Sequence, residues 1–536
     1  MYWTGIAYIL NYRNIELDMK IFYSMKSILC FLMLCVLCFD LDAENPFKVR
    51  AFHLDMRVEV MTVEALENLA EELAREGINT IIMEYEATFP FMKHATICNR
   101  NAYTKEEVEH FVSHCSELGI DVVPLQHCFG HCEHILRHDR YRALRESAKD
   151  PSQVCPLKID EAVEVFTEIF SEVAALHPSK YFHIGADETY LLGTCKNCCV
   201  VAEKEGKSRL FVDYIKAMCD IVDGMGKTPV IWADIILNYP ELLSELPDNL
   251  VFVDWNYGWE PDRFGKLDNL LGQGVRMWGA SALRSGPDNW YMTQWMKHFN
   301  NIRDFIPFAR KNGYEGMVQT SWSTSGTFGY YLDSGYEVLD MQPVRLVYPM
   351  SAFGILQEAF CQAVNSETEF VPEVFIREYA RKRMGLGEAG ENVLMRYFSM
   401  PQEQIYIDSS GAADASGRTL PELLEECISV RAELASLHPI DHRNELSHWL
   451  LMLDMRINYL KFKEVEGRVQ SSEYDRSQVS SLVSELEKIL KQENSIDKRF
   501  AKLNKGYIKD SDIEYMNYIK SFKIKELYQR LKNSYK

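Results

Sequence analysis

Residues 180–189 read Lys-Tyr-Phe-His-Ile-Gly-Ala-Asp-Glu-Thr, and this stretch gives the first indication of the fold. An apolar run of β-forming residues leads into two small residues and then two adjacent carboxylates, Asp187 and Glu188. Removing two neighbouring anions from water is costly, so an ordinary core strand would not end in this way. The pattern is typical of a buried strand that delivers acids into a pocket, where we expect the chemistry.

Seven further short apolar stretches are similar, and together the eight predict a set of buried strands. Because they are apolar on both faces, they fit a parallel sheet that is covered on both sides. Helical periodicity separates most of them; Leu66, Leu69 and Leu73, for example, form one stripe behind a capping Thr62. The predicted strands are residues 48–55, 78–85, 120–125, 181–186, 229–234, 251–255, 274–279 and 316–322.

Eight such units within about 275 residues predict an α/β fold, a (β/α)₈ TIM barrel. A doubly wound open sheet is the alternative, but no glycine-rich phosphate loop follows the first strand. The active site of a barrel lies at the carboxyl ends of its strands. Asp187, Glu188 and Asp234 fall at such ends.

Size and charge limit the class of protein. The chain has 536 residues, 47% hydrophobic and 25% charged, as in soluble globular proteins. Its net charge of −20 disfavours nucleic acid and anionic membranes as partners. We expect the barrel at residues 45–340, barrel-end helices and a linker at 341–418, and an α-helical C-terminal domain at 419–536 that packs on the barrel or forms a homodimer.

Residues 1–44 resemble a targeting segment. The apolar run at 28–39 has the length of a signal-peptide core and is too short to span a bilayer. What precedes it lacks such a pattern, so we expect a spurious N-terminal extension and a true start at Met25 or Met19. No later stretch is apolar enough to span. We therefore expect an exported protein, periplasmic or secreted, with a lipid anchor at Cys38 as an alternative.

Two groups of residues raise the question of a metal. The spacing of His127, His131, His134 and His138 would stripe one helix face, but the loop-like residues 128–130 place the first two before the helix. A pocket role for His131 is then the stronger interpretation, and we expect no metal and no cofactor for the reaction.

Cysteines form the second group. Cys195, Cys198 and Cys199 follow the acidic pair, and a Cys-x-x-Cys unit can be half a zinc site or a local disulfide. Cys128, Cys132 and Cys155 can complete a site only if the fold brings them close. Free buried thiols, a disulfide and a metal site all stay open.

Tryptophan recurs at four of the eight predicted strand ends. Tryptophan beside carboxylates suits sugars, whose C–H faces stack on rings while their hydroxyls bond to charged groups. Ordinary core packing is the alternative for any one of them. The four are Trp232, Trp255, Trp278 and Trp322.

The residues His-Ile-Gly-Ala-Asp-Glu at 183–188 resemble the His-x-Gly-(Gly/Ala)-Asp-Glu signature of family 20 glycoside hydrolases, the β-N-acetylhexosaminidases. Arg50 with Asp55 is similar to the arginine and aspartate of that family's first strand. Residues 126–133 resemble its third-strand Gly-His element, and with residues 84–90 they look most like the hexosaminidase D branch.

The resemblance implies an exo-acting, retaining enzyme that removes terminal β-linked GlcNAc or GalNAc from glycans. In this family the substrate's own 2-acetamido oxygen is the nucleophile, and an oxazolinium intermediate forms. Glu188 would be the acid and then the base, while Asp187 would accept the acetamido N–H and stabilise the cation. Tyr257 would bond the acetamido oxygen. A catalytically silent carbohydrate-binding barrel and a metal-dependent barrel hydrolase are the alternatives.

The resemblance also implies how the sugar is held. Arg50 would bind its outer hydroxyls, the four tryptophans would wall the acetamido pocket with Trp322 as its floor, and His131, His183 and Asp55 would support the acidic pair. One departure concerns the eighth strand, where many members carry Trp-x-Glu but Trp322 is followed by Ser and Thr. We therefore expect the remaining hydroxyl contacts from Asp234 or Glu84.

Overall fold

The structure is a computed structural model that describes residues 45–324, 328–329, 342–343, 346–408 and 411–534. The predicted targeting segment, residues 1–44, lies outside these residues and stays a prediction. The chain divides after Pro46, and the barrel and the helices that follow it belong to the compact unit Phe47–Lys536.

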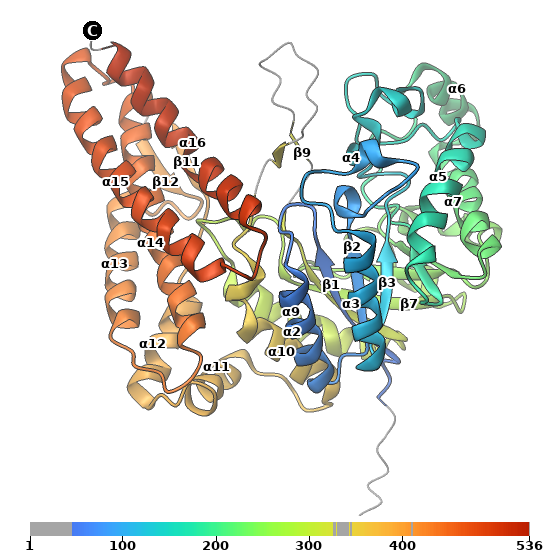
Figure 1. Ribbon diagram of the computed structural model, residues 1–536, viewed down its shortest axis with the longest axis horizontal. Helices are drawn as coiled ribbons and strands as arrows, with labels where there is room; N and C mark the ends of the chain where they lie inside the picture. Colours follow the sequence, from blue (N-terminus) through green and yellow to red (C-terminus); the bar gives the residue numbers. More distant parts are fainter. Residues whose placement is uncertain (1–44, 325–327, 330–341, 344–345, 409–410, 535–536) are drawn as a thin grey trace, which may run out of the picture. The chain divides into compact units, whose positions relative to one another are not determined.

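Eight parallel strands close into a barrel in the order of the sequence, and β8 pairs back with β1. Figure 1 shows β1, β2 and β3 of this barrel with α2 and α3 beside them. The predicted (β/α)₈ barrel is confirmed, and the open-sheet alternative is wrong. The strands are β1 (Val49–Asp55), β2 (Thr80–Glu84), β3 (Asp121–Leu125), β4 (Tyr181–His183), β5 (Thr228–Trp232), β6 (Val251–Trp255), β7 (Arg276–Arg284) and β8 (Gly316–Ser321).

Capping residues mark where the first helices of the barrel begin. Thr62 caps α2 (Val63–Arg75) by accepting from Ala65 N, and Thr104 with Glu107 forms a capping box on α3 (Lys105–Glu117). Further along are α4 (Glu133–Leu136), α5 (Ile159–Ala175), α6 (Lys196–Glu205), α7 (Lys207–Gly224), α8 (Asp268–Leu271) and α9 (Trp295–Lys311).

The ring of helices is uneven where loops build the carboxyl-terminal rim. Two 3₁₀ turns, η4 (Ile236–Asn238) and η5 (Pro240–Glu245), follow β5, and only the short α8 follows β6. α9 begins at Trp295, after a loop in which Asp288 accepts from Ser285 N at 3.0 Å and from Gln294 N at 2.9 Å.

The barrel interior is packed with side chains from alternate strand positions. Trp278 is fully buried there, with its ring edge-on to Tyr181 at 5.0 Å between centroids. A Cβ at Gly316 would lie 2.7 Å from the Trp278 ring, so the glycine makes room for the indole. Because β7 continues to Arg284, Trp278 lies well inside the barrel, and its predicted place in a sugar pocket is wrong.

The C-terminal region is helical, as predicted, apart from one hairpin of β11 (Ile405–Asp408) with β12 (Gly411–Asp414). The short pair β9 (Phe328–Gly329) and β10 (Gln342–Pro343) precedes it. No described helix combines the length and the apolar character that crossing a bilayer requires. The helices are α10 (Gly354–Asn365), α11 (Pro372–Lys382), α12 (Glu388–Ser399), α13 (Leu420–Ala435), α14 (Arg443–Gln470), α15 (Val479–Asn504) and α16 (Asp510–Ser534).

The start of α16 is bonded to the loop between β1 and α2. Asp512 Oδ2 accepts from Val60 N at 2.8 Å, and its other oxygen accepts from Asn101 Nδ2. The same loop is also joined to the carboxyl end of β7, by the buried ion pair of Glu59 with Arg284. The last helix of the chain therefore helps to fix the loop that leaves the first strand.

Candidate active site

The acidic pair follows β4 on a turn with unusual backbone geometry. Gly185, Ala186 and Glu188 have φ values of 74°, 78° and 49°, and side-chain-bearing residues rarely adopt this left-handed region. A Cβ at Gly185 would lie 2.1 Å from His127 Nδ1, so only glycine fits there. The turn ends the strand at His183, short of the predicted residue 186, and carries Asp187 and Glu188 to the barrel rim.

His131 bonds both carboxylates through one nitrogen. Its Nε2 is 3.3 Å from Asp187 Oδ2 and 3.2 Å from Glu188 Oε2. The loop that carries it approaches the acidic turn closely, since a Cβ at Gly130 would lie 2.3 Å from Asp187 O. Two loops that are far apart in sequence are thus held together at the point where the acids lie.

Contacts between His131 and Asp187 determine the charge that each carries. Burial alone would lower the pKa of His131, but the Asp187 charge and the bonds to both carboxylates raise it well above the ordinary value. Burial alone would raise the pKa of Asp187, yet His131 lowers it. At neutral pH the site therefore contains an imidazolium and an anionic Asp187.

Glu188 is held from three directions. Tyr190 OH donates to Glu188 Oε1 at 2.8 Å, opposite the contact with His131. The backbone N–H of Glu188 donates to Asp234 Oδ2 at 3.0 Å, and Trp255 Nε1 donates to Asp234 Oδ1 at 3.3 Å. Burial, followed by the nearby Asp187 charge, raises the pKa of Asp234 to about 7. Asp234 thus anchors the acidic turn and is not among the residues that line the cavity.

A cavity of about 260 Å³ opens above the acidic pair. Its walls are rich in aromatic side chains, and its described carboxylates are those of Asp187 and Glu188. It is lined by Arg57, His127, His131, Asp187, Glu188, Tyr190, Trp232, Trp255, Tyr257, Trp259, Arg263, Phe264, Ser285, Gly286, Trp322 and Thr324.

Three of the four predicted tryptophans and Tyr257 belong to this wall. Trp322 Nε1 donates to Tyr257 OH at 2.9 Å, which fixes the phenol. The Trp255 and Tyr257 rings lie 5.2 Å apart, and those of Trp232 and Trp322 lie 5.9 Å apart. The structure therefore brings these side chains together around the acids as the sequence suggested, with Trp278 as the exception.

Of the two arginines near β1, Arg57 lines the cavity and Arg50 does not. Arg50 lies at the amino end of β1, where Nε donates to Gly77 O at 2.7 Å and Nη1 to Phe47 O at 2.9 Å. Five residues of strand, about 16 Å, separate it from Asp55. The expectation for Arg50 is therefore wrong, because it assigned a residue from the wrong end of the strand.

The Arg57 guanidinium is fixed by acids on β1 and β2. It donates from Nε and Nη2 to the two oxygens of Asp55, each at 2.9 Å, and Nε is 3.2 Å from Glu84 Oε1. Glu84 also contacts His53 at 2.9 Å and His127 at 3.3 Å. Burial opposes its charge, but Arg57 and His127 hold the pKa of Glu84 well below the ordinary value. Glu84 thus supports the site from behind and is not a lining residue.

His183 supports the acidic turn from inside the barrel. Its Nδ1 accepts from Gly185 N at 3.0 Å, and burial lowers its pKa to about 3, so the ring is neutral. The ring lies 4.6 Å from that of Trp232. These contacts place His183 against the turn, and its role as a support of the acidic pair stays a prediction.

The predicted histidine stripe does not converge on one point. His127 and His131 precede α4, as expected, whereas His134 bonds Gln126 at 3.0 Å and His138 bonds Thr96 at 3.2 Å. Glu84, Glu86 and His127 do come close together. The Arg57 guanidinium lies beside Glu84 and also favours the charged form of Glu86, so a side chain supplies positive charge to this group.

The sequence did not identify several lining residues, because they lie on loops without helical or strand periodicity. The Arg263 guanidinium lies 4.1 Å from the centre of the Trp259 ring, and both come from the loop after β6. Tyr190 follows the acidic pair by two residues, and this closeness was its only sequence signal.

The family model described as "Glycosyl hydrolase family 20, catalytic domain" matches residues 47–315, which is half of the chain. Hexosaminidase D from Bos taurus is 28% identical over 293 residues, covering 51% of this chain and 84% of that protein. Hexosaminidase D from Homo sapiens is 25% identical over 303 residues, covering 53% of this chain and only 61% of that protein.

Solved structures are more distant. A β-N-acetylhexosaminidase from Bacteroides fragilis gives a TM-score of 0.47 at 18% identity, over 63% of this chain and 70% of that one. A Flavobacterium johnsoniae chitobiase gives 0.48 at 14% identity, over 91% and 73%. The family match covers the strands that carry the acidic turn, Arg57 and most of the aromatic wall. The chain therefore belongs to glycosyl hydrolase family 20 and is a glycoside hydrolase.

Proposed function

We propose that this glycoside hydrolase is an exo-acting, retaining β-N-acetylhexosaminidase that uses the acetamido group of its substrate as nucleophile. The observation that carries the proposal concerns Asp187. Its Oδ1 is buried and accepts no hydrogen bond from the described residues, with His127 Nδ1 3.6 Å away, while Oδ2 is held by His131. An anionic acceptor of this kind suits an N–H donor supplied by the substrate.

The placing of the carboxylates favours a nucleophile that comes from the substrate. Retaining enzymes with a protein nucleophile place two carboxyl groups about 5–5.5 Å apart on opposite sides of the scissile bond. Here Asp187 and Glu188 share one turn and one histidine, and the described lining residues that follow β6 and β8 include no carboxylate. The acetamido oxygen is the remaining nucleophile within reach of the anomeric carbon.

In the first step Glu188 gives its proton to the leaving oxygen as the glycosidic bond breaks and the acetamido oxygen bonds to the anomeric carbon. Asp187 accepts the acetamido N–H and stabilises the positive charge of the oxazolinium. Tyr257 accepts from Trp322 and would donate its own proton to the acetamido oxygen. In the second step Glu188 takes a proton from water, which opens the oxazolinium and restores the anomeric configuration.

Arg57 replaces Arg50 in the binding of the outer hydroxyls. A guanidinium held rigidly by Asp55 and Glu84 offers donors in a fixed direction to the sugar oxygens. The cavity is smaller than the roughly 300–1,000 Å³ of sites for drug-sized ligands, which suits one terminal sugar ring. Thr324 stands near the place of the family's strand-eight acid, so both GlcNAc and GalNAc are candidates.

The test compares aryl β-GlcNAc, β-GalNAc and β-glucoside substrates with the full-length protein. We expect turnover of at least one acetamido sugar and none of the glucoside. Fluorine on the acetyl group should lower kcat/KM progressively, because it weakens the acetamido nucleophile. Equal turnover of the glucoside, or indifference to fluorine, would overturn the mechanism, and binding without any turnover would favour a silent sugar-binding barrel.

A further inference from the structure

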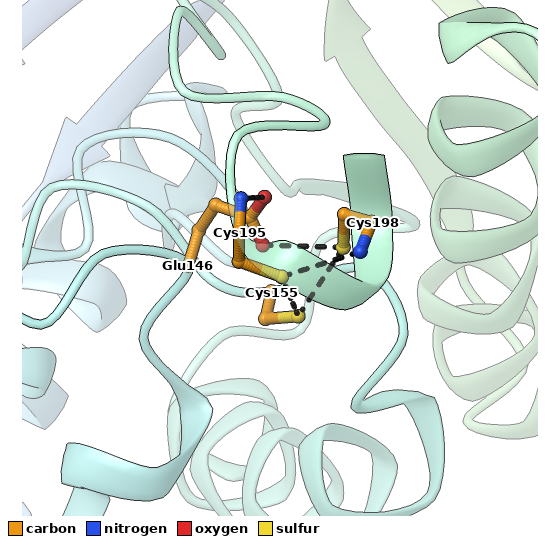
Figure 2. A group of neighbouring side chains, drawn as sticks. All are labelled: Glu146, Cys155, Cys195 and Cys198. Atoms are coloured by element: carbon orange, nitrogen blue, oxygen red, sulfur yellow. Dashed lines mark hydrogen bonds between the residues drawn. The ribbon is translucent and has the colours of Figure 1, made fainter. Parts of the chain in front are cut away.

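Four side chains outside the active site converge on a single point (Figure 2). Glu146 and Cys155 come from the segment between η3 (Asp139–Leu144) and α5, Cys195 caps α6, and Cys198 lies in its first turn. One ligand atom from each lies within 4.8 Å of all the others. Cys195 and Cys198 therefore lie beside Glu146 and Cys155, and Cys155 precedes Cys195 by 40 residues in the chain.

The distances match a tetrahedral metal site better than a disulfide. Cys155 Sγ is 3.9 Å from Cys195 Sγ and 3.5 Å from Cys198 Sγ, and Cys198 Sγ is 3.3 Å from Glu146 Oε2. Zinc bound at about 2.3 Å by thiolates in a tetrahedron separates the sulfurs by about 3.8 Å. A disulfide would need about 2.05 Å, and all three cysteines are free thiols in the structure.

The surroundings hold the fourth ligand in place. Glu146 Oε1 accepts from the backbone N–H groups of Thr194 and Cys195, each at 2.8 Å, which leaves Oε2 directed at the sulfurs. Cys198 N donates to Cys195 Sγ at 3.3 Å, the kind of bond that supports a thiolate ligand. Such outer contacts orient the ligands of structural metal sites.

Most of the site is shielded from solvent. Cys155, Cys198 and Glu146 are buried, and Cys195 is partly exposed. Three thiolates and a carboxylate in such a place are costly without a cation. Binding of a divalent ion would release the thiol protons to solvent and compensate the charge. With four protein ligands, no position is left open for catalysis.

We propose that Glu146, Cys155, Cys195 and Cys198 bind one structural Zn²⁺. Thiolate ligands select soft or borderline metals, and three sulfurs with one carboxylate oxygen in tetrahedral array suit zinc. Because Cys195 lies seven residues after Glu188, the ion pins the far end of the loop that carries Glu188 and Tyr190. Leu191 N donates to Gln153 Oε1 at 2.8 Å within the same loop, which adds a second link to this segment.

The direct test measures metal content in the full-length protein purified without chelator or a metal-affinity step. We expect about one zinc per chain by elemental analysis. Cys198→Ser and Cys155→Ser should lose it, whereas Cys199→Ser should keep it. Cys199 is the matched control, since it is the adjacent residue, carries the same substitution and is exposed. Equal zinc in all three variants would place the ion elsewhere and overturn the assignment.

A second measurement on the unmutated protein removes any dependence on how the variants fold. A mercurial titrated into the folded protein should release zinc as the thiols of the cluster react, followed with a zinc-binding dye. Replacement by Co²⁺ should give sulfur-to-metal charge-transfer absorption. A zinc-free protein that takes up neither ion, or a mass two hydrogens lower from a disulfide at Cys155, would overturn the proposal. Neither readout depends on sugar hydrolysis, so this inference and the proposed activity fail separately.

Discussion

The sharpest prediction for the reaction concerns Asp187→Asn, which keeps a hydrogen-bond acceptor but removes the charge. A full charge about 3 Å from the acetamido nitrogen contributes roughly 5 kcal/mol at an effective dielectric constant of about 20. If about half of that charge has developed in the transition state, the variant loses about 3 kcal/mol, or about 10²-fold in kcat. KM should change little, because the neutral amide N–H of the ground state still finds an acceptor.

The same substitution has an independent electrostatic readout at His131. The Asp187 charge is the largest of the contacts that raise the pKa of His131 against its burial. A raised histidine pKa contributes stability that is fully present below the ordinary value of about 6.5 and is lost as pH rises through the folded value. In Asp187→Asn this loss should be complete at lower pH, and an NMR titration of the His131 ring should show the lowered pKa.

Asp254→Asn is the control for this experiment. Asp254 is a buried acid on β6 that accepts from Tyr314 OH at 2.7 Å and does not line the cavity. Its substitution should leave kcat and the His131 titration unchanged. The reasoning is refuted if Asp187→Asn retains its kcat within a factor of about three, or if the His131 pKa is unmoved while the protein stays folded.

Three further outcomes are expected. Glu188→Gln should lower kcat by about 10²–10⁴-fold on substrates with poor leaving groups and by less on a dinitrophenyl glycoside, which needs no proton; an equal loss on both would contradict its role as acid. Arg57→Ala should lower kcat/KM by about 10²-fold, whereas Arg50→Lys should not change it, and the reverse ranking would restore Arg50 to the site. Trp278→Phe should reduce the free energy of unfolding by about 2 kcal/mol in urea without changing kcat, so loss of activity with unchanged stability would show that its ring reaches the sugar.

Much of the fold could be predicted because its signals are local. A parallel strand buried on both faces reads as a short apolar run, and the caps at Thr62 and Thr104 involve residues within three positions. The acidic pair could also be predicted from local sequence, because two adjacent acids at the end of a buried strand need a pocket. The sequence predicts where a strand ends less well than where its apolar core lies. Trp278 was therefore predicted at the rim, although β7 continues to Arg284.

The remaining parts of the site depend on contacts between distant segments. Arg57 gains its position from Glu84 on the next strand, and Arg263 from a loop that follows no periodic pattern. Cys155 was a candidate partner for the Cys195 pair only if the fold brought them together. Glu146 was not considered, because nothing near it in the sequence marks it as a ligand.

The bond between Val60 N and Asp512 Oδ2 joins residues 452 positions apart. A ribosome adding about 5–20 residues per second needs roughly 20–90 s to synthesise that interval. During this time the barrel strands have all emerged, yet the loop beside Arg57 still lacks the acceptor for its backbone. The loop that leaves β1 is therefore among the parts of the molecule that are completed late during translation, although its residues are among the earliest to be made.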